Sequence, residues 1–296
     1  MSEPPRWPEL IQCEDEDPDE FLESLLEDLL SEGSEDMAAF LKAYFDESER
    51  FEDRGVFAVA GLAFAPGAVR EFLKEWRDML GPMKYFHMVD LQRGRNEFKG
   101  MPRRERFARL REAVGIINRH RLFAVAVSCS PQDFKEIRIP KETRGMRTPY
   151  GVCAHFCMCQ VGNWLKRNSA SSTAVAYFFE DGHTGSTDIR ELLAVVGNNK
   201  AVRQTYQRSS DTFLEKADLR AIPIQAADIL VWHYAKFRDA DLPATEITGR
   251  CWELLSGNQA EFVSVHLGYS QLRDFLGLIQ DIEKQPPEFF NSPDYD

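Results

Sequence analysis

The chain has 296 residues, of which 43% are hydrophobic, a composition typical of a globular protein with a sizeable core. No apolar run approaches the roughly 20 residues that span a bilayer, and the N-terminus is acidic where a secretion signal would be basic and apolar. The six cysteines are scattered, which excludes a small disulfide scaffold. We therefore expect a soluble, cytoplasmic protein that has no membrane partner.

The net charge of −12 is concentrated in residues 1–37, which hold fourteen acids and one base. Inside this arm, apolar residues recur at helical spacing and predict a short amphipathic acidic helix. They are Phe21, Leu22, Leu25, Leu26, Leu29 and Leu30. This helix either docks its leucine face on the domain or on a second subunit, or it forms a partner-binding or self-inhibitory arm over a basic groove. We divide the chain into this arm, a main domain over residues 38–284 and an acidic, proline-containing tail over residues 285–296.

The first elements of the main domain are an aromatic, apolar segment and the apolar run 55–64 that follows it. The first segment begins at Ala43 and ends in two adjacent carboxylates, Asp46 and Glu47. This pattern predicts a hairpin with acid at the tip of its first strand. The two acids are either turn residues or candidate metal ligands.

Downstream of the hairpin, periodicity and chain breakers predict alternating helices and strands. Strands are expected over residues 84–90, 122–127 and 173–179, and helices over residues 66–80, 101–119, 150–164, 188–208 and 223–237, with further helices filling residues 245–285. The third strand would end in Asp90, and the fifth in Glu180 and Asp181. Together the elements predict an α/β domain with a mixed five-stranded sheet, flanked by helices and extended by additional C-terminal helices.

The predicted helix that begins at Pro223 is apolar on almost every side, so we expect it to be buried. Asp228 lies inside it, and an isolated buried carboxylate costs several kcal/mol unless it is paired, hydrogen-bonded, protonated or bound to a cation. Gln225 lies three residues earlier and shares its face of the helix. Asp228 therefore indicates either a salt bridge to an arginine or a cation-binding site.

Carboxylates at the ends of several strands, together with one on a buried helix, are what a hard divalent cation such as Mg²⁺ requires. Here they are Asp46, Asp90, Glu180, Asp181 and Asp228. Two such ions can activate a water molecule and stabilise the leaving oxygen in phosphodiester cleavage. The pattern favours metal-dependent phosphodiester chemistry, provided that the acids converge.

Several of these segments resemble the domain of unknown function 3800 family, over residues 41–237. They are the strand before Asp46-Glu47-Ser48, the strand Val59-Ala60-Gly61, the pair Phe86-His87, the carboxylates Glu180-Asp181 and the segment Gln225-Ala226-Ala227-Asp228-Ile229. The resemblance implies a ribonuclease H-like fold and a metal-dependent nuclease, and some members of the family are linked to bacterial defence against phage. Three strands, a helix, a strand, a helix and a strand are also the order that a ribonuclease H-like sheet would give, with an extra helix here after the second strand.

The resemblance also implies a set of metal ligands. Asp46 would be the ligand after the first strand, Asp181 or Glu180 the middle ligand, and Asp228 the ligand on the late helix. The cofactor implied is Mg²⁺ or Mn²⁺.

Three further residues would complete the catalytic site that the resemblance implies. Gln225 and His87 would orient water or phosphate, and Glu47 would lie beside the first ligand. Glu49 stands where the family tends to have glycine. Because a glutamate resists positive φ, this departure bears on the local geometry of Glu47 more than on that of the aspartate before it.

Residues 91–121 hold ten basic residues and three acids, a balance typical of a surface that binds the phosphate backbone of nucleic acid. The candidate phosphate-binding residues are Arg93, Arg95, Lys99, Arg103 and Arg104, with Lys141 and Arg144 extending the surface in the next loop. The alternative is a solvated basic face that docks the acidic arm.

The sequence thus leads to one principal hypothesis and one alternative. The first is a cytoplasmic nuclease that uses Mg²⁺ or Mn²⁺ to cleave DNA or RNA, in a bacterial defence or mobile-element context. The alternative is a noncatalytic nucleic-acid-binding or regulatory subunit on the same fold. It predicts salt-sensitive binding without cleavage.

Overall fold

The computed structural model describes residues 40–48, 55–65, 67–137, 139, 145–168, 174–181, 185–198, 208–214, 219–238, 246–257 and 261–283. The chain divides into two compact units, residues 1–38 and 39–296, and all the described residues belong to the second. The predicted acidic arm and C-terminal tail lie outside the described residues, as do Lys141 and Arg144.

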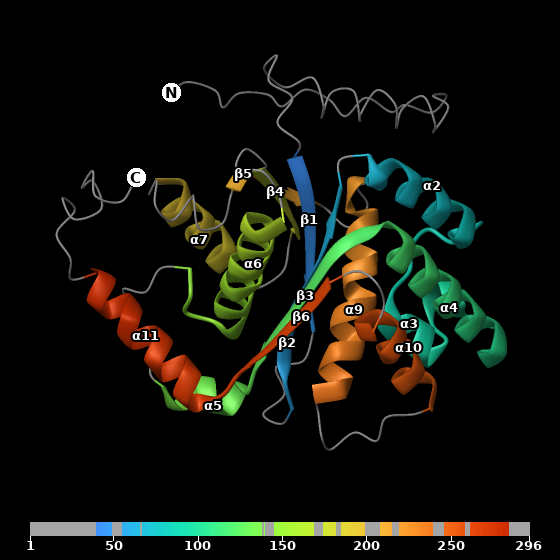
Figure 1. The fold of residues 1–296 in the computed structure, drawn as a ribbon. Helices are drawn as coiled ribbons and strands as arrows, with labels where there is room; N and C mark the ends of the chain where they lie inside the picture. The colour runs from blue at the N-terminus through green and yellow to red at the C-terminus, as the bar shows by residue number, and fades with distance from the viewer. Residues whose placement is uncertain are drawn as a thin grey trace, which may run out of the picture. The chain divides into compact units, whose positions relative to one another are not determined.

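Six strands form one mixed sheet in this part of the chain (Figure 1). They are β1 (Phe40–Glu47), β2 (Phe57–Phe64), β3 (Arg121–Cys129), β4 (Ala174–Glu180), β5 (Arg208–Leu214) and β6 (Glu261–Leu267). The order across the sheet is β5-β4-β1-β2-β3-β6. β1 and β3 run antiparallel to β2 between them, whereas the pairs β1 with β4, β4 with β5 and β3 with β6 are parallel.

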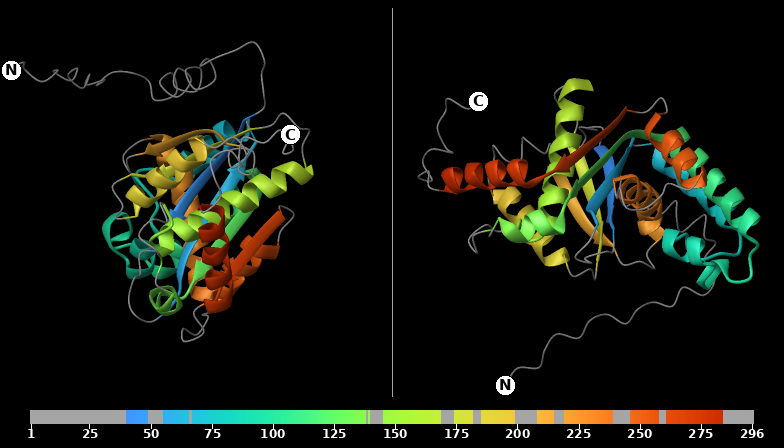
Figure 2. Two further views of the ribbon diagram at one scale, coloured as in Figure 1. Left: turned by 90° about the vertical axis from the view of Figure 1, so that its left-hand side faces the viewer. Right: turned by 90° about the horizontal axis from the view of Figure 1, so that it is seen from below.

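Helices cover both faces of the sheet. They are α2 (Ala68–Leu80), α3 (Met88–Arg93), α4 (Arg103–His120), α5 (Pro131–Glu136), α6 (Pro149–Asn168), α7 (Ser186–Asn198), α9 (Ile222–Arg238), α10 (Glu246–Gly257) and α11 (Tyr269–Glu283), with the short 3-10 helices η1 (Asn96–Phe98) and η2 (Leu219–Ala221). The views in Figures 1 and 2 agree that the sheet separates α6 and α7 from α2, α4 and α9. Every residue of β2 is buried, because helices pack on both of its faces. No helix in the described part of the chain is long and apolar enough to cross a membrane.

Aromatic residues of β1 build the core on each face in turn, because successive side chains of a strand point to opposite sides. Tyr44 stacks on Phe178 with ring centroids 4.5 Å apart, and Phe45 stacks on Phe179 at 5.2 Å on the other face. An added Cβ at Gly61 would lie 2.3 Å from a ring carbon of Phe45. The glycine of the Val59-Ala60-Gly61 strand is therefore required by the aromatic ring that crosses it.

The structure confirms an α/β fold with a mixed sheet flanked by helices, but the sheet has six strands in the described residues, not five. The predicted strand over residues 84–90 is wrong, because this stretch runs without regular structure to His87 and then forms α3. β5 and β6 were not predicted, and β6 lies where only helices were expected. Both are edge strands, and an edge strand can carry polar residues because one side and part of one face remain uncovered.

Candidate functional site

Two carboxylates leave the sheet side by side at the ends of β1 and β4. The register of these parallel strands pairs Tyr44 with Phe178 and the following residue of β1 with Phe179. The next residues along the strands are Asp46 and Glu180, so alternation places both on the face that Tyr44 and Phe178 share. By the same alternation, the next acid of each strand end, Glu47 and Asp181, lies toward the opposite face of the sheet.

Helix α9 brings a third carboxylate to this face. Asp228 is only 8% exposed, and its Oδ2 accepts a hydrogen bond of 2.7 Å from the backbone N–H of Met88. Burial, followed by the negative charges of Glu47, Asp228 and Glu180, raises the pKa of Asp46 well above its usual value. The Glu47 N–H donates to Asp46 Oδ1 at 2.9 Å and opposes this rise only in part. We call Asp46, Glu47, Glu180 and Asp228 the acidic cluster.

Tyr150, near the start of α6, belongs to the surroundings of the acidic cluster, although sequence reasoning did not identify it. It is 1% exposed, and burial together with the charges of Glu47, Asp46 and Glu180 raises the pKa of its hydroxyl. The phenol is therefore kept neutral, as a hydrogen-bond donor. No local pattern marked this residue, because the acids that act on it come from distant strands.

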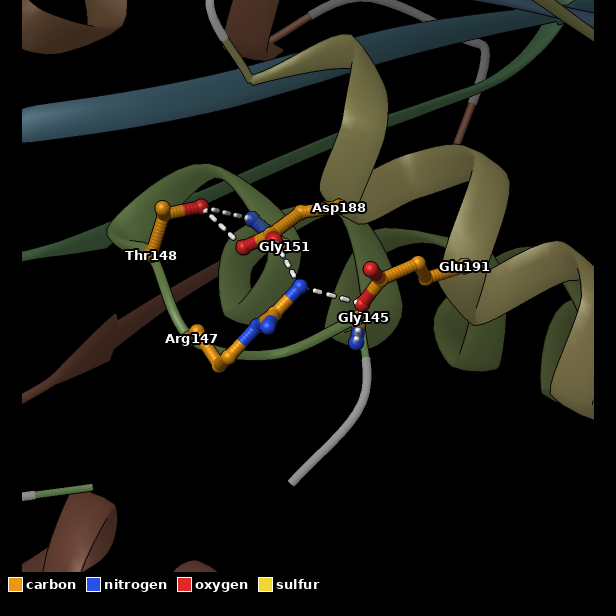
Figure 3. Close-up of polar contacts among 6 residues, drawn as sticks. All are labelled: Gly145, Arg147, Thr148, Gly151, Asp188 and Glu191. Atoms are coloured by element: carbon orange, nitrogen blue, oxygen red, sulfur yellow. Dashed lines mark hydrogen bonds and ion pairs between the residues drawn. The ribbon is translucent and has the colours of Figure 1, made fainter. Parts of the chain in front are cut away.

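The start of α6 is fixed to α7 by a network of polar contacts (Figure 3). Thr148 Oγ1 donates to Asp188 Oδ2 at 2.7 Å and accepts from the Gly151 N–H at 3.2 Å. Arg147 forms ion pairs with Asp188 and Glu191 of α7. Arg147 thus has a structural role at the start of α6, close in sequence to Tyr150.

Two polar side chains of α9 anchor the segment before α3. Gln225 Oε1 accepts hydrogen bonds from Trp76 Nε1 at 3.1 Å and from the Phe86 N–H at 2.9 Å. With the bond from the Met88 N–H to Asp228, the backbone is held on both sides of His87. This anchoring explains why residues 84–90 do not form a strand, since two of their backbone donors, the N–H groups of Phe86 and Met88, bond to side chains of α9 and not to a neighbouring strand.

Asp181 occupies a different environment from Glu180. Its Oδ1 lies 2.8 Å from Arg190 Nη2 of α7, and its N–H donates to the Leu214 carbonyl at 2.8 Å. The guanidinium of Arg190 in turn lies 3.8 Å above the ring of Phe213. Of the two residues that the sequence left open as the middle acid, only Glu180 is among the charges that raise the pKa of the first-strand aspartate.

No group of three or more His, Cys, Asp or Glu side chains in the described ranges is placed to hold a metal ion. The chemistry of the acidic cluster nevertheless suits a hard cation, since all its donors are carboxylate oxygens. Mg²⁺ keeps several waters and often takes only one or two protein carboxylates. A cation would also relieve the repulsion that opposes ionisation of Asp46.

Eight of the ten basic residues of 91–121 fall into two sets. The first is tied to backbone carbonyls and stabilises the fold: Arg106 bonds to Leu91 and Gln92, Arg109 to Met79, and Arg121 to Leu255. The second set is exposed and comprises Arg93, Arg95, Lys99, Arg103 and Arg104. This exposed set begins at the end of α3, the helix whose first residue is anchored by Asp228.

No protein-family model matches the chain, and no curated protein matches it either. Among solved structures it is similar to a chain in the structure of the PCNA:RNase HII complex from Archaeoglobus fulgidus, with a TM-score of 0.39 and 15% identity, covering 83% of this chain and 92% of that chain. A likeness of this size defines neither fold nor function. The fold and the site by themselves define an α/β protein with a largely buried acidic cluster at the ends of two parallel strands.

Replacing Gln225 by alanine is expected to lower the free energy of unfolding by about 2–4 kcal/mol, because two donors lose their acceptor in the protein interior. These donors, Trp76 Nε1 and the Phe86 N–H, belong to residues that are 0% and 1% exposed. Urea denaturation measures the effect. Gln132→Ala is the matched control, since Gln132 bonds Glu136 on an exposed face of α5, and its loss should cost less than about 0.5 kcal/mol. Equal losses in the two variants would contradict the anchoring role.

Proposed function

We propose that this chain is a divalent-metal-dependent nuclease that hydrolyses phosphodiester bonds of DNA or RNA. The observation that carries the proposal is that carboxylates from three separate elements meet around Asp46: Glu180 follows the paired strand β4, and Asp228 comes from α9. Bringing like charges together in a partly buried place costs folding free energy, and such arrangements are concentrated at functional sites. Binding a cation at the acidic cluster would explain why the fold keeps these carboxylates together despite the loss of folding free energy.

The proposal includes a ribonuclease H-like fold and membership of the domain of unknown function 3800 family. In its support, β1, β2 and β3 are followed by α6, β4, α7 and β5, the order expected of such a sheet, with α2 to α4 inserted after β2 and the short α5 before α6. β6 would then be an addition at the edge next to β3. The resemblance allowed either Glu180 or Asp181 as the middle ligand. We propose Glu180, because its charge acts on Asp46 whereas Asp181 pairs with Arg190.

One or two of the carboxylates of Asp46, Glu180 and Asp228 would hold Mg²⁺ or Mn²⁺, with water as the remaining ligands; the bound ion would activate water and stabilise the leaving oxygen. The chain's own groups supply the rest of the site. The exposed set Arg93, Arg95, Lys99, Arg103 and Arg104 would hold the phosphate backbone by charge. The neutral hydroxyl of Tyr150 would donate a hydrogen bond to a carboxylate of the acidic cluster and fix its orientation.

The test is an assay of the full chain on single- and double-stranded DNA and RNA, with Mg²⁺ or Mn²⁺. We expect cleavage that stops on chelation and falls by more than about a hundredfold in Asp228→Asn, which removes a charge aimed at the reacting centre. Asparagine can still accept from Met88, so the anchor remains. Asp274→Asn makes the same chemical change at an exposed position of α11 and should leave cleavage unchanged. Cleavage that survives both Asp46→Asn and Asp228→Asn overturns the proposal.

The second candidate is a noncatalytic nucleic-acid-binding or regulatory subunit, favoured by the five exposed basic residues that begin at the end of α3. Its binding would weaken steeply with salt, and neither metal ion would produce cleavage. A gel-shift titration at several salt concentrations, run beside the cleavage assay, separates the two candidates. We also propose that the acidic arm contacts a protein partner or the chain itself. A role in bacterial defence is a further part of the proposal.

A further inference from the structure

A histidine and two polar partners lie beside the anchored segment of the site. His87 Nδ1 is 3.2 Å from Asp90 Oδ2, and Asn96 Nδ2 donates to the same oxygen at 2.9 Å. Asp90 is 7% exposed, whereas the side chain of His87 is 19% exposed. The carboxylate is therefore sheltered, and the imidazole reaches the surface.

The backbone on both sides of His87 is held by α9, and one of the two anchors belongs to the acidic cluster. The residues on either side of it, Phe86 and Met88, donate their N–H groups to Gln225 and Asp228 of α9. The charge of Asp228 acts in turn on Asp46. The backbone that carries His87 is thus fixed to Asp228, one of the carboxylates proposed to bind the metal ion.

The contact with Asp90 selects one form of the imidazole. An ionised carboxylate only accepts hydrogen bonds, so the neutral ring facing it carries its proton on Nδ1 and a lone pair on Nε2. The amide of Asn96 bonds the same carboxylate oxygen and fixes its direction. With Nδ1–H directed at the carboxylate of Asp90, Nε2 with its lone pair is the atom of His87 that can accept a proton.

We propose that His87 is the general base of this site and that Asp90 and Asn96 are its positioning residues, an inference that rests on the proposed nuclease function. Nε2 takes a proton from the attacking water as the new O–P bond forms and the P–O bond to the leaving sugar oxygen breaks. Asp90 stabilises the resulting imidazolium, which then returns the proton to the leaving oxygen. Protons and electron pairs balance without a further reactant.

A purely structural role is the competing explanation, since Asp90 also accepts the Arg95 N–H at 3.0 Å through its backbone carbonyl at the end of α3. The chain offers a matched control. His120 Nε2 lies 3.0 Å from Glu75 Oε1, a second histidine–carboxylate pair between α4 and α2. Glu75→Gln and Asp90→Asn therefore make the same chemical change at two pairs, of which only one adjoins the acidic cluster.

The experiment measures kcat and KM for cleavage by the full chain, and records the imidazole ¹⁵N shifts of His87 by NMR, in the wild type and in His87→Ala, Asp90→Asn, Asn96→Ala and Glu75→Gln. We expect kcat to fall by about a hundredfold or more in His87→Ala and Asp90→Asn, with KM nearly unchanged. Added imidazole should restore part of the activity of His87→Ala. The shifts should report the Nδ1–H form in the wild type and its loss in Asp90→Asn, and Glu75→Gln should change neither readout.

Each other outcome is decisive. Wild-type activity in His87→Ala overturns the general base while leaving the nuclease proposal intact. A fall in kcat that follows thermal stability and is not rescued by imidazole assigns a structural role instead. A wild-type protein that cleaves nothing with either metal ion defeats the proposed function and the catalytic role together, even if the ¹⁵N shifts still report the Nδ1–H form.

Discussion

Asp46→Asn is expected to abolish cleavage and, at the same time, to make the folded protein more stable. Asparagine keeps the oxygen that accepts from the Glu47 N–H at 2.9 Å, but it removes a partly buried charge that Glu47, Asp228 and Glu180 repel. We expect cleavage to fall by more than about a hundredfold and the free energy of unfolding to rise by about 1 kcal/mol, or about 2–4 °C in Tm. Thermal denaturation beside the cleavage assay measures both.

The gain in stability from Asp46→Asn should depend on pH in a fixed direction. Because the folded pKa of Asp46 is raised, the folded protein holds this proton more tightly than the unfolded chain, whose aspartate ionises near 3.8. Wild-type stability from this group therefore falls as pH rises from the unfolded value through the raised folded value. The advantage of the variant should be largest at neutral pH and should shrink toward acid. An advantage that grows as pH falls would contradict the repulsion.

His233→Phe is expected to protect the fold against acid. His233 is 1% exposed, its Nδ1 bonds the Ile229 carbonyl at 2.7 Å, and its Nε2 has no hydrogen-bond partner among the residues that the structure describes. Burial lowers its pKa to about 4. In the wild type, His233 of the unfolded chain takes up a proton near pH 6.5, whereas His233 of the folded protein takes it up only near pH 4. The contribution of neutral His233 to stability is therefore fully present above pH 6.5 and is lost as the pH falls from 6.5 to about 4.

The size of this acid effect is on the order of 2–3 kcal/mol, from about 1.4 kcal/mol for each unit of pKa difference. Phenylalanine cannot take a proton, so urea denaturation at pH 7.5 and 4.5 should show a smaller loss in the variant. Burial also lowers the pKa of His155 to about 4, so part of the loss should remain and His155→Phe serves as the comparison. An unchanged pH dependence in His233→Phe would show that the residue is not buried as a neutral imidazole.

The central strands of the sheet could be predicted because both of their faces are covered. β2 and β3 are buried along nearly their whole length, which requires the continuous apolar runs seen in the sequence. The helix around Asp228 is also buried as its composition predicts. In these elements the local pattern and the final environment agree, so the sequence is sufficient.

The edge strands and the segment before α3 could not be predicted in this way. β5 begins Arg208-Ser-Ser-Asp, a run with little strand pattern, and its place is decided by pairing with β4. Residues 84–90 have the pattern of a strand, yet their backbone donors bond to Gln225 and Asp228 of α9. Long-range hydrogen bonds, which no local pattern encodes, decided both cases.

By itself the sequence determined that acids follow two aromatic strands and that one lies inside an apolar helix. Only the tertiary structure decided which of these acids lie together. Successive side chains of a strand lie on opposite faces of the sheet. Glu180 shares the face of Asp46 and acts on it, whereas Asp181 pairs with Arg190. Glu47 acts on Asp46 as its direct neighbour in the chain. The same long-range packing brought Tyr150 to the acidic cluster, because the burial and the neighbouring charges that raise its pKa arise only when distant strands meet.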